Sequence, residues 1–277
     1  TAPSSKTFTV AVTLVSKTLS SNSWAVIKAV SDAGQGANYW SVGATKSVTI
    51  NGKVGATTIS SLKVDAFIIG FNHNSGKEGS NRIHFLLGKI SGKFVGLVDG
   101  NYGNSSSTSG AFTMNTTNTN SGGWGSSQMR SKVLGSASSP TSPTANTLLA
   151  ALPSDLRAVM KSCTKYTDNK GGNNTAINVS STTDYLFLLS EYEVFATHQY
   201  CNDAEPNYQA QYDYFKAGNS KVANKHSATG TAAVWWLRSP NYNNINNNNY
   251  FCEVSSSGSL DYHYAYYAYG VVPGFVV

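Results

Sequence analysis

The sequence has few charged residues, which make up 12% of its 277 residues, or about half of the usual share. Ser, Thr, Asn and Gly supply the polarity instead, which favours a surface or extracellular β-rich protein over a cytosolic enzyme. The net charge of +6 is thinly spread, because no run of basic residues exceeds two. Proteins that follow a phosphate backbone need clustered Lys and Arg, so we expect no nucleic-acid partner.

Cysteines and long apolar runs are also scarce. The three cysteines, Cys163, Cys201 and Cys252, are too few for a disulfide scaffold, and their odd number leaves at least one free thiol. No apolar run approaches ~18 residues, so we expect no membrane insertion. The chain opens with TAPSSKTFTVAV, which has no features of a signal peptide. We therefore expect residues 1–22 to be a strand or linker that ends a preceding region of a longer polypeptide.

Short strands dominate the expected secondary structure. Alternation of apolar and polar residues predicts a strand over residues 7–15, and the Asn-Gly pair at 51–52 predicts a hairpin turn. Ser23 is placed to cap a helix that begins at Trp24 and stops at Gly34.

Further helices are expected where local signals for helix ends occur. One helix should end at Gly135, and the next should be broken at Pro153. After a buried strand over residues 184–190, Ser190 and Glu193 have the spacing of a capping box. A last helix is expected within residues 208–218, and residues 101–126 should form a loop. The sequence therefore predicts an α+β fold with a mostly antiparallel sheet, a few flanking helices and long loops.

Two tracts near the C-terminus have unusual compositions. Residues 241–250 read NYNNINNNNY, with Asn at seven of ten positions, and residues 261–269 read DYHYAYYAY. Both lie between segments that resemble core strands, WWLRSP and GVVPGF. A strand with Tyr on both faces cannot bury every ring with a satisfied hydroxyl group, so part of this aromatic surface should be exposed. Tyr, Asn and Ser also dominate antibody combining sites. The composition therefore indicates a binding surface.

The C-terminal segments WWLRSP, FCEV, SSGSL and YGVVPGF, in this order, resemble the end of the C-type-lectin-like fold in its formylglycine-generating-enzyme-like branch. More narrowly, they resemble the variable proteins of diversity-generating retroelements in bacteria and their phages. YWSVGATKSVTINGKV, FIIGFNHNS, GGWGSSQMRSKVLG, YTDN and LFLLSEYEVF are similar to the same family, so the resemblance covers residues 24–277. It implies a rigid ligand-binding domain over residues 23–277, whose hypervariable part, about 241–269, is rewritten by a reverse transcriptase that miscopies adenines.

The tracts fit this mechanism at the codon level. Asn is encoded by AAY, and one adenine change gives Tyr, His, Asp, Ile, Ser or Thr. Every residue of both tracts except two alanines, Ala265 and Ala268, is Asn or one such change from it. Lys, Glu, Gln and Met are absent from both tracts, although the rest of the chain uses them freely. A low-complexity loop followed by an aromatic strand face is the plain structural alternative.

The resemblance thus predicts receptor binding by a phage tail protein or a protein displayed on a bacterial surface. The expected ligand is a bacterial surface macromolecule, either protein or glycan, and no catalytic residue, cofactor or metal is expected. The predicted ligand-binding residues are Asn241, Tyr242, Asn243, Asn244, Ile245, Asn246, Asn247, Asn248, Asn249, Tyr250, Asp261, Tyr262, His263, Tyr264, Tyr266, Tyr267 and Tyr269. The predicted scaffold residues are Trp235, Trp236, Leu237, Arg238, Gly258, Gly270 and Phe275.

Two other functions stay open at this point. One is a sulfatase-modifying oxidase, which would need a redox-active cysteine pair. The other is a passive structural phage protein. The sequence EPN at 205–207 matches the calcium and mannose motif of animal C-type lectins, but the expected partner WND is missing. His198 and Cys201 have a metal-like spacing without a second pair. Asp65 and His73 fit structural roles better than catalysis.

Overall fold

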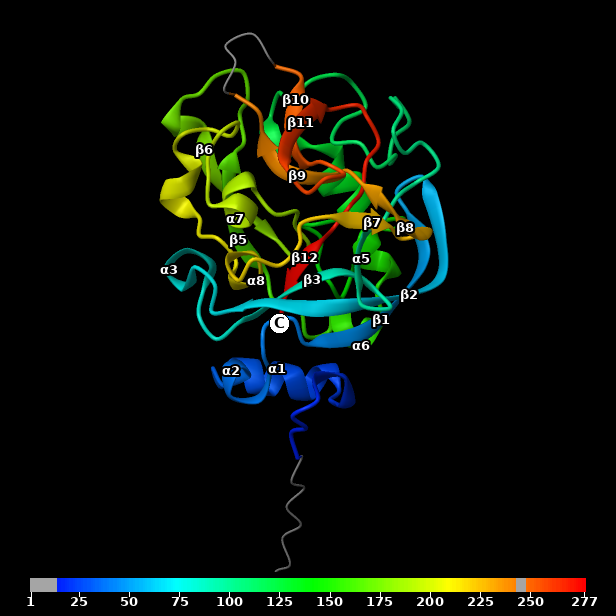
Figure 1. The fold of residues 1–277 in the computed structure, drawn as a ribbon, viewed down its shortest axis with the longest axis vertical. Coiled ribbons are helices and arrows are strands. Elements are labelled where there is room, and N and C mark those ends of the chain that lie inside the picture. Colours follow the sequence, from blue (N-terminus) through cyan, green and yellow to red (C-terminus); the bar gives the residue numbers. More distant parts are fainter. Residues whose placement is uncertain (1–13, 243–247) are drawn as a thin grey trace, which may run out of the picture.

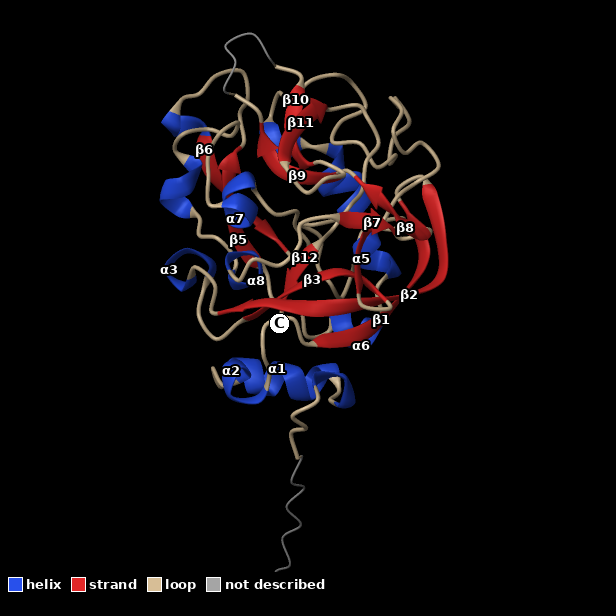
Figure 2. Cartoon of the chain, viewed as in Figure 1, coloured by secondary structure: helices blue, strands red, loops and turns tan. Residues whose placement is uncertain are grey.

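The protein is described from a computed structural model, which places residues 14–242 and 248–277. It is a mixed protein in which short helices flank mostly antiparallel sheets, as the sequence predicts (Figures 1 and 2). Most of the strand predicted over residues 7–15 lies outside the described residues. Residues 14–22 are the described part of the predicted linker, and they pack against the domain. Leu19 is buried, and the carbonyl oxygen of Ser16 accepts a hydrogen bond from Trp40 Nε1 at 3.0 Å.

The strands are β1 Thr45–Val54, β2 Thr57–Phe71, β3 Ile83–Ile90, β4 Lys93–Gly96, β5 Cys163–Asp168, β6 Val179–Asp184, β7 Ala223–Lys225, β8 Ala228–Ala233, β9 Trp235–Pro240, β10 Tyr250–Val254, β11 Leu260–Tyr264 and β12 Gly274–Val276. The α-helices are α1 Trp24–Asp32, α2 Gly36–Tyr39, α3 Ser75–Glu78, α4 Gly123–Ser126, α5 Leu148–Ala151, α6 Ser154–Arg157, α7 Glu191–Phe195 and α8 Asp213–Lys216. The 3-10 helices are η1 Leu19–Ser21, η3 Ala176–Asn178 and η4 Glu205–Tyr208, and η2 Met129–Leu134 is a π-helix. None of the helices within residues 14–242 and 248–277 is both long enough and apolar enough to cross a membrane.

The described residues form three sheets. The largest has the order β1-β2-β3-β4-β7-β8, with β12 also paired to β3, and its only parallel pair among the described residues is β4 with β7. A three-stranded sheet has the order β11-β10-β9, and β5 pairs with β6. The three-stranded sheet lies at the opposite end of the molecule from α1 and α2 (Figure 1). The two tracts therefore lie at this far end.

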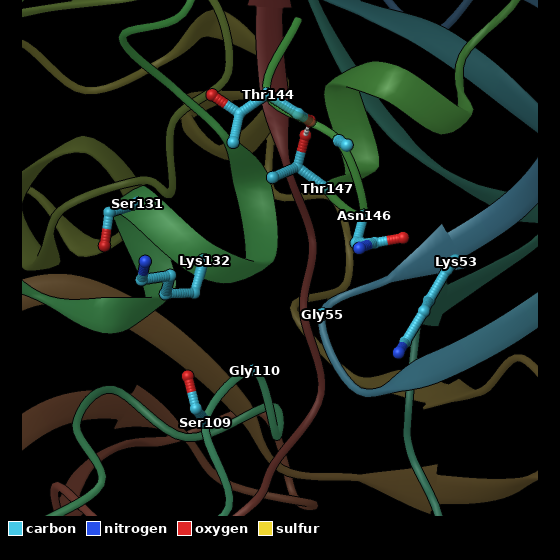
Figure 3. A pocket seen from close by; sticks show the side chains of 10 residues that line it. Lys53, Gly55, Ser109, Gly110, Ser131, Lys132, Thr144, Asn146 and Thr147 are labelled. Atoms are coloured by element: carbon cyan, nitrogen blue, oxygen red, sulfur yellow. Dashed lines mark hydrogen bonds between the residues drawn. The ribbon is translucent and has the colours of Figure 1, made fainter.

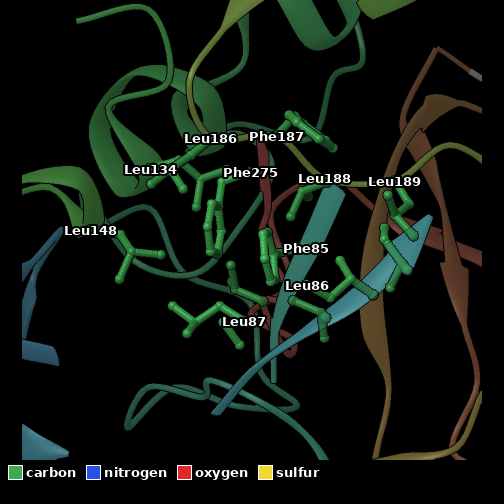
Figure 4. Packing of buried hydrophobic residues seen from close by; sticks show 14 of the residues in the cluster. Phe85, Leu86, Leu87, Leu134, Leu148, Leu186, Phe187, Leu188, Leu189 and Phe275 are labelled. Carbon is green, nitrogen blue, oxygen red and sulfur yellow. The ribbon is translucent and has the colours of Figure 1, made fainter. Parts of the chain in front are cut away.

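The core joins the first helix to the last strand. Ser23 caps α1 as predicted, because its side chain accepts a hydrogen bond from the Val26 amide at 3.2 Å. Trp24 points inward and packs edge-on against Phe85 of β3 and Phe275 of β12, with ring centroids 5.6 and 6.0 Å away. Phe85 and Phe275 stack on each other, and leucines from four segments surround them (Figure 4). Burying each of these rings stabilises the fold by about 2–3 kcal/mol.

The predicted turn at residues 51–52 is wrong. β1 continues through Asn51 and Gly52, where its register with β2 shifts, and the chain reverses at Gly55 and Ala56. A distant segment fixes this turn: the Ala56 amide donates a hydrogen bond to the carbonyl oxygen of Gly110 at 2.8 Å. Gly55 has φ +58°, and a Cβ atom there would lie 2.0 Å from the same oxygen. A tertiary contact thus overrides the strongest local turn signal.

Replacing Gly55 with alanine should lower the free energy of unfolding by at least ~2 kcal/mol, because it adds a clash to an unfavourable φ angle. Gly43→Ala is the matched control. Gly43 also has a positive φ, +91°, but has nothing within 4 Å of its would-be Cβ, so its loss should be only about 1 kcal/mol. Urea unfolding of both variants measures the difference. Equal losses would show that the contact with Gly110 does not constrain the turn.

The remaining helix-end predictions are mostly confirmed. η2 ends at Gly135 in the left-handed conformation, and Pro153 separates α5 from α6. Ser190 and Glu193 form a complete capping box at the start of α7. The helix expected over residues 208–218 is limited to α8, after an irregular stretch. Residues 186–190 are buried, but the strand predicted over residues 184–190 does not form. Among the described residues, this stretch makes one bridge, between Phe187 and Gly274.

Candidate functional site

The three-stranded sheet brings the two tracts together, as predicted. β10 and β11 pair antiparallel, which places Tyr250 opposite Tyr264 and Cys252 opposite Tyr262. The Asn241 amide donates a hydrogen bond to the carbonyl oxygen of Tyr250 at 3.0 Å. The tract ends are therefore neighbours in space.

Six partly exposed tyrosines form a continuous aromatic surface at this end of the molecule. We call it the tyrosine surface, and it consists of Tyr200, Tyr250, Tyr262, Tyr264, Tyr266 and Tyr267. The Tyr262 ring packs edge-on against Tyr200 and Tyr250, with centroid distances of 4.8 and 5.1 Å. Tyr250 stacks on Tyr264 at 4.6 Å, and Tyr264 lies 6.0 Å from Tyr266. Such contacts hold each ring in place while leaving part of it open to solvent.

The Gly, Ser, Thr and Asn-rich loop over residues 101–126 holds the second tract by its backbone. Amides of Ser106 and Asn115 donate hydrogen bonds to the carbonyl oxygens of Tyr266 and Ala265, at 2.8 and 2.9 Å. β11 ends at Tyr264, so the tract does not continue as a strand, and this loop fixes the turn that follows. The loop prediction is confirmed for residues 101–122, but residues 123–126 form α4. The composition of the loop gave no sign of this supporting role.

Three predicted ligand-binding residues are buried, which corrects their expected exposure. Asn241, Tyr242 and Tyr269 are only 1%, 5% and 8% exposed. Burial raises the pKa of Tyr242, and its hydroxyl group has no hydrogen-bond partner among the described residues. Tyr269 packs against Trp236, with ring centroids 5.2 Å apart. These side chains support the surface from beneath.

The other predicted positions fall into two groups. Asn243, Asn244, Ile245, Asn246 and Asn247 lie outside the described residues. The remaining nine are exposed or partly exposed: Asn248, Asn249, Tyr250, Asp261, Tyr262, His263, Tyr264, Tyr266 and Tyr267.

Two aromatic residues near the tracts could not be found from the sequence. Tyr200 lies about forty residues before the first tract, yet the Tyr242 amide donates a hydrogen bond to its carbonyl oxygen at 2.8 Å. Tyr102 packs edge-on against Tyr269 at 5.7 Å, and its hydroxyl group accepts a hydrogen bond from the Val234 amide. Neither has a spacing that links it to the tracts, so no signal in the sequence identified them.

The sheet beneath this surface contains an acidic side chain without a hydrogen bond on one oxygen. Glu253 of β10 is 4% exposed, and its Oε2 has no partner among the described residues. Burial, with a smaller contribution from the charge of Asp261, raises the pKa of Glu253 to about 9. Burial lowers the pKa of His263. At neutral pH both side chains are therefore uncharged. The two tracts contain one acidic residue, Asp261.

The predicted scaffold residues support this sheet. Trp235, Trp236, Leu237, Arg238 and Phe275 are fully buried. A Cβ atom on Gly270 would lie 2.8 Å from the carbonyl oxygen of Val234, so these two backbones need a glycine to approach so closely. Gly258 has φ +84° in the turn after β10. The scaffold prediction agrees with these positions.

A buried network of charged side chains connects β9 with α7, β5 and α3. The Arg238 guanidinium donates to both carboxylate oxygens of Glu193, at 2.5 and 3.0 Å, and Lys165 Nζ donates to Glu193 at 2.9 Å. Lys165 also donates to Glu78 Oε2 at 2.7 Å. Burial opposes ionisation of Glu193, but the charges of Arg238 and then Lys165 outweigh it and lower its pKa. The pKa of Glu78 is raised, because burial outweighs its single cation.

Two groups of side chains in and around this network have the atom types and spacing that could hold a metal ion. His73, Glu78 and Glu193 have ligand atoms within 4.8 Å of one another, as do Glu78, His84 and Cys163. The Lys165 ammonium group already occupies the space between the two carboxylates and donates a third hydrogen bond to Tyr212 Oη at 2.8 Å. A metal ion would have to displace it, so the arrangement fits a structural role. The His73 ring also stacks on the Tyr212 ring, with ring centroids 3.6 Å apart.

The cysteines are poorly placed for thiolate chemistry. All three are free and buried, and burial raises the pKa of each thiol. The Cys201 amide and the Cys252 thiol both donate to Glu191 Oε2, at 2.7 and 3.5 Å. A protonated thiol is a poor nucleophile, so burial disfavours thiolate chemistry at these three cysteines.

The first residue of the EPN motif, Glu205, points inward. Glu205 is fully buried and accepts hydrogen bonds from the Asp168 amide at 3.0 Å and from Ser239 Oγ at 2.7 Å. Burial raises the pKa of Glu205 to about 7. Glu205 therefore has a structural role here and does not present its oxygen atoms to a surface calcium ion, whereas Asn207 is exposed. His198 is exposed whereas Cys201 is buried, so their metal-like spacing brings together no common site.

Comparison with known proteins places the tyrosine surface inside a recognised domain. No curated protein and no solved structure matches the chain. A family model described as a domain of unknown function, DUF6273, matches residues 107–277. This segment includes both tracts, β9 to β12 and most of the supporting loop. Because the match covers more than half of the sequence, the chain belongs to the DUF6273 family.

Proposed function

We propose that this protein binds a macromolecule of a bacterial surface, protein or glycan, through the tyrosine surface. We further propose that the domain is a C-type-lectin-like variable protein of a diversity-generating retroelement, carried on a phage tail or displayed on a bacterial cell. The observation that carries the proposal is that the two tracts and Tyr200 form one aromatic surface, with six partly exposed tyrosines on a backbone held by neighbouring segments.

The physical character of the surface supports binding. Tyrosine gives a large contact area and a hydroxyl group while freezing only two side-chain torsions. The backbone beneath it is hydrogen-bonded to the loop over residues 101–126, so little ordering is needed when a ligand arrives. The exposed Asn248 and Asp261 at its margin add polar contacts.

The proposal separates positions that can vary from positions that cannot. Tyr262, Tyr264, Tyr266 and Tyr267 are partly exposed, whereas Trp235 to Pro240 of β9 are buried. Changes at the first set cost little packing, and changes at the second disrupt the core. Such a division suits a surface that is rewritten repeatedly on a fixed scaffold.

Deep sequencing of the 3′ end of this gene from a natural population tests the diversification directly. We expect substitutions to concentrate at adenine positions of codons 241–269, while codons 235–240 and 270–275 stay constant. Tyr242 and Tyr269 should vary less than Tyr262 and Tyr264, because their rings are buried. Substitutions spread evenly along the gene would overturn the retroelement proposal and leave only the exposed aromatic surface in favour of binding.

Replacing Tyr262, Tyr264, Tyr266 and Tyr267 together with serine should abolish binding without unfolding the domain. Labelled wild-type protein should stain some isolates in a panel of intact bacteria, and the variant should stain them at least about tenfold less, since aromatic anchors dominate interface energies. Its urea midpoint should stay close to that of the wild type.

Tyr192→Ser is the matched control, because Tyr192 is partly exposed but lies on α7, outside the tyrosine surface. It should stain the same isolates as the wild type. A quadruple variant that binds normally would contradict the proposal, and one that unfolds would show that these rings are core residues.

A further inference from the structure

Glu191, the first residue of α7, is a buried acidic residue outside the network of Lys165 and Arg238. Its side chain is fully buried, and it forms no ion pair within residues 14–242 and 248–277. Burying a carboxylate without a cation is costly unless hydrogen bonds satisfy its oxygens. The groups that donate to Glu191 therefore indicate its role.

Three of these donors are backbone amides of consecutive residues. The Tyr200 and Cys201 amides donate to Glu191 Oε2 at 3.1 and 2.7 Å. The Gln199 amide donates to the other oxygen, Oε1. All three residues belong to a stretch that forms neither helix nor strand, which follows the turn at Ala196, where φ is +56°. The carboxylate thus gives this stretch the hydrogen bonds that a neighbouring strand would otherwise supply.

Glu191 also connects Tyr200 to the tracts. Its Oε2 accepts a hydrogen bond from the Cys252 thiol at 3.5 Å, and Cys252 lies opposite Tyr262 in the pair of β10 and β11. The Tyr200 ring packs edge-on against the Tyr262 ring at 4.8 Å, and the Tyr200 carbonyl oxygen accepts a hydrogen bond from the Tyr242 amide at 2.8 Å. One buried carboxylate therefore holds both sides of the contact between Tyr200 and Tyr262.

The tyrosine surface lies outside three clefts among the described residues, which have volumes of about 300, 410 and 520 Å³. Figure 3 shows the first of them, between the β1–β2 turn and η2, and no tyrosine lines it. A ligand of the tyrosine surface therefore contacts its rings outside these clefts. Its affinity then depends on how firmly each ring is held before binding, because ordering a mobile ring opposes association.

Tyr200 differs from the other tyrosines of this surface by its place in the sequence. It lies outside residues 241–269, the part that the proposed diversification rewrites. We propose that Glu191 is a positioning residue, which holds Tyr200 against the tracts as a constant ligand contact of the tyrosine surface. This inference rests on the proposed function, since a constant contact requires that the tracts bind ligands and vary. Natural variants with different tracts should then all bind partly through the same ring.

Glu191→Gln tests the positioning role without a ligand. Glutamine keeps the shape, but it has one acceptor oxygen, and its NH₂ group would face the backbone N–H groups. The nuclear Overhauser effects between the Tyr200 and Tyr262 rings should therefore be lost in the folded variant. Their retention would overturn the positioning role.

Asp184→Asn is the matched control for a loss of stability alone. Asp184 is equally buried, but it accepts its hydrogen bonds from side chains outside the tyrosine surface. The variant should lower the urea midpoint and keep the nuclear Overhauser effects between the Tyr200 and Tyr262 rings. Their loss in this variant as well would show that any destabilisation disturbs the contact, and would overturn a specific role for Glu191.

Hydrogen exchange of the wild-type protein tests the same contact without any variant. The amides of Gln199, Tyr200 and Cys201 should exchange at least about tenfold more slowly than unprotected amides, although their stretch has no strand partner. Unprotected exchange at all three amides would overturn the proposal, even if Glu191→Gln failed to fold.

Staining of the bacterial isolates that bind the labelled wild-type protein tests the ligand contact. Tyr200→Ser and Glu191→Gln should each raise the half-saturating protein concentration at least about fivefold, since an aromatic anchor is lost or displaced. The double variant should bind no more weakly than Tyr200→Ser, because Glu191 acts through that ring. Additive losses would overturn the positioning role, and unchanged binding by Tyr200→Ser would overturn the constant contact.

Failure of this inference can be distinguished from failure of the proposed function. Normal binding by the quadruple tract variant contradicts the proposed function. Normal binding by Tyr200→Ser, beside a defective quadruple variant, overturns the constant contact alone. If no isolate stains with the wild-type protein, the ligand contact fails together with the proposed function, and the ring contact and amide exchange still decide whether Glu191 positions Tyr200.

Discussion

Replacing Lys165 with methionine should lower the free energy of unfolding by about 3–5 kcal/mol, the largest loss that we expect from a single substitution. The Lys165 side chain is fully buried and donates hydrogen bonds to Glu78, Glu193 and Tyr212. Glu193 keeps Arg238 as a partner when Lys165 is lost, but Glu78 hydrogen-bonds to no other lysine or arginine among the described residues.

The two histidines near Glu78 carry no charge at pH 7 in the wild-type protein. His73 Nε2 and His84 Nδ1 each lie 3.8 Å from a Glu78 oxygen. Burial, followed by the charge of Lys165, lowers the pKa of His73 to about 3 and keeps that of His84 well below its usual value. Both rings are therefore neutral at pH 7, and the variant leaves a buried carboxylate that must stay unpaired or take up a proton.

Urea unfolding of Lys165→Met and Lys28→Met measures this effect against a matched control. Lys28 forms an exposed ion pair with Asp32 at 2.5 Å, so its replacement should change stability by no more than ~0.5 kcal/mol. Adding Glu78→Gln to Lys165→Met should restore part of the loss, because it removes the uncompensated charge. Equal losses for Lys165→Met and Lys28→Met would contradict a structural role for the buried network.

The stability of the protein should fall as pH rises from about 6 to 8, and Glu253→Gln should remove much of this dependence. The pKa of Glu253 is raised from 4.5 to about 9 in the folded protein. Between these two values the folded state holds a proton on this carboxyl group that the unfolded state has lost. The contribution is therefore fully present below pH 4.5 and is lost as pH rises toward 9.

The difference in unfolding free energy between Glu253→Gln and the wild type isolates this group. It should grow in favour of the variant by about 1 kcal/mol per pH unit between pH 6 and 8, since glutamine keeps the shape and cannot ionise. Asp261→Asn is the control: Asp261 lies opposite Glu253 in the sheet but is exposed, so its replacement should have a much smaller effect. A difference that stays constant with pH would mean that Glu253 ionises with an ordinary pKa.

Local signals in the sequence were reliable where neighbouring residues alone decide the structure. The Ser23 cap, the Ser190–Glu193 capping box and the helix end at Gly135 all depend on hydrogen bonds or φ angles within one turn of helix. The position of the two tracts between buried strands likewise made their pairing predictable, because β10 and β11 are joined by a short turn. These features could be read without knowing the rest of the fold.

Contacts between distant segments decided what the sequence could not. The chain turns at Gly55 and not at the Asn-Gly pair at 51–52, because the backbone of Gly110 packs against that of Gly55. Tyr200 lies in the tyrosine surface although it is distant in the sequence. Tyr242 and Tyr269 are buried, although they are the same residue type as their exposed neighbours in the tracts.

The sequence by itself determined the fold class, the local helix ends and the place of the aromatic tracts. Only the tertiary structure decided which tyrosines are exposed, and that Lys165 and Arg238 neutralise two buried glutamates. The physical reason is that burial and charge pairing depend on long-range packing, whereas periodicity and capping depend on residues a few positions apart.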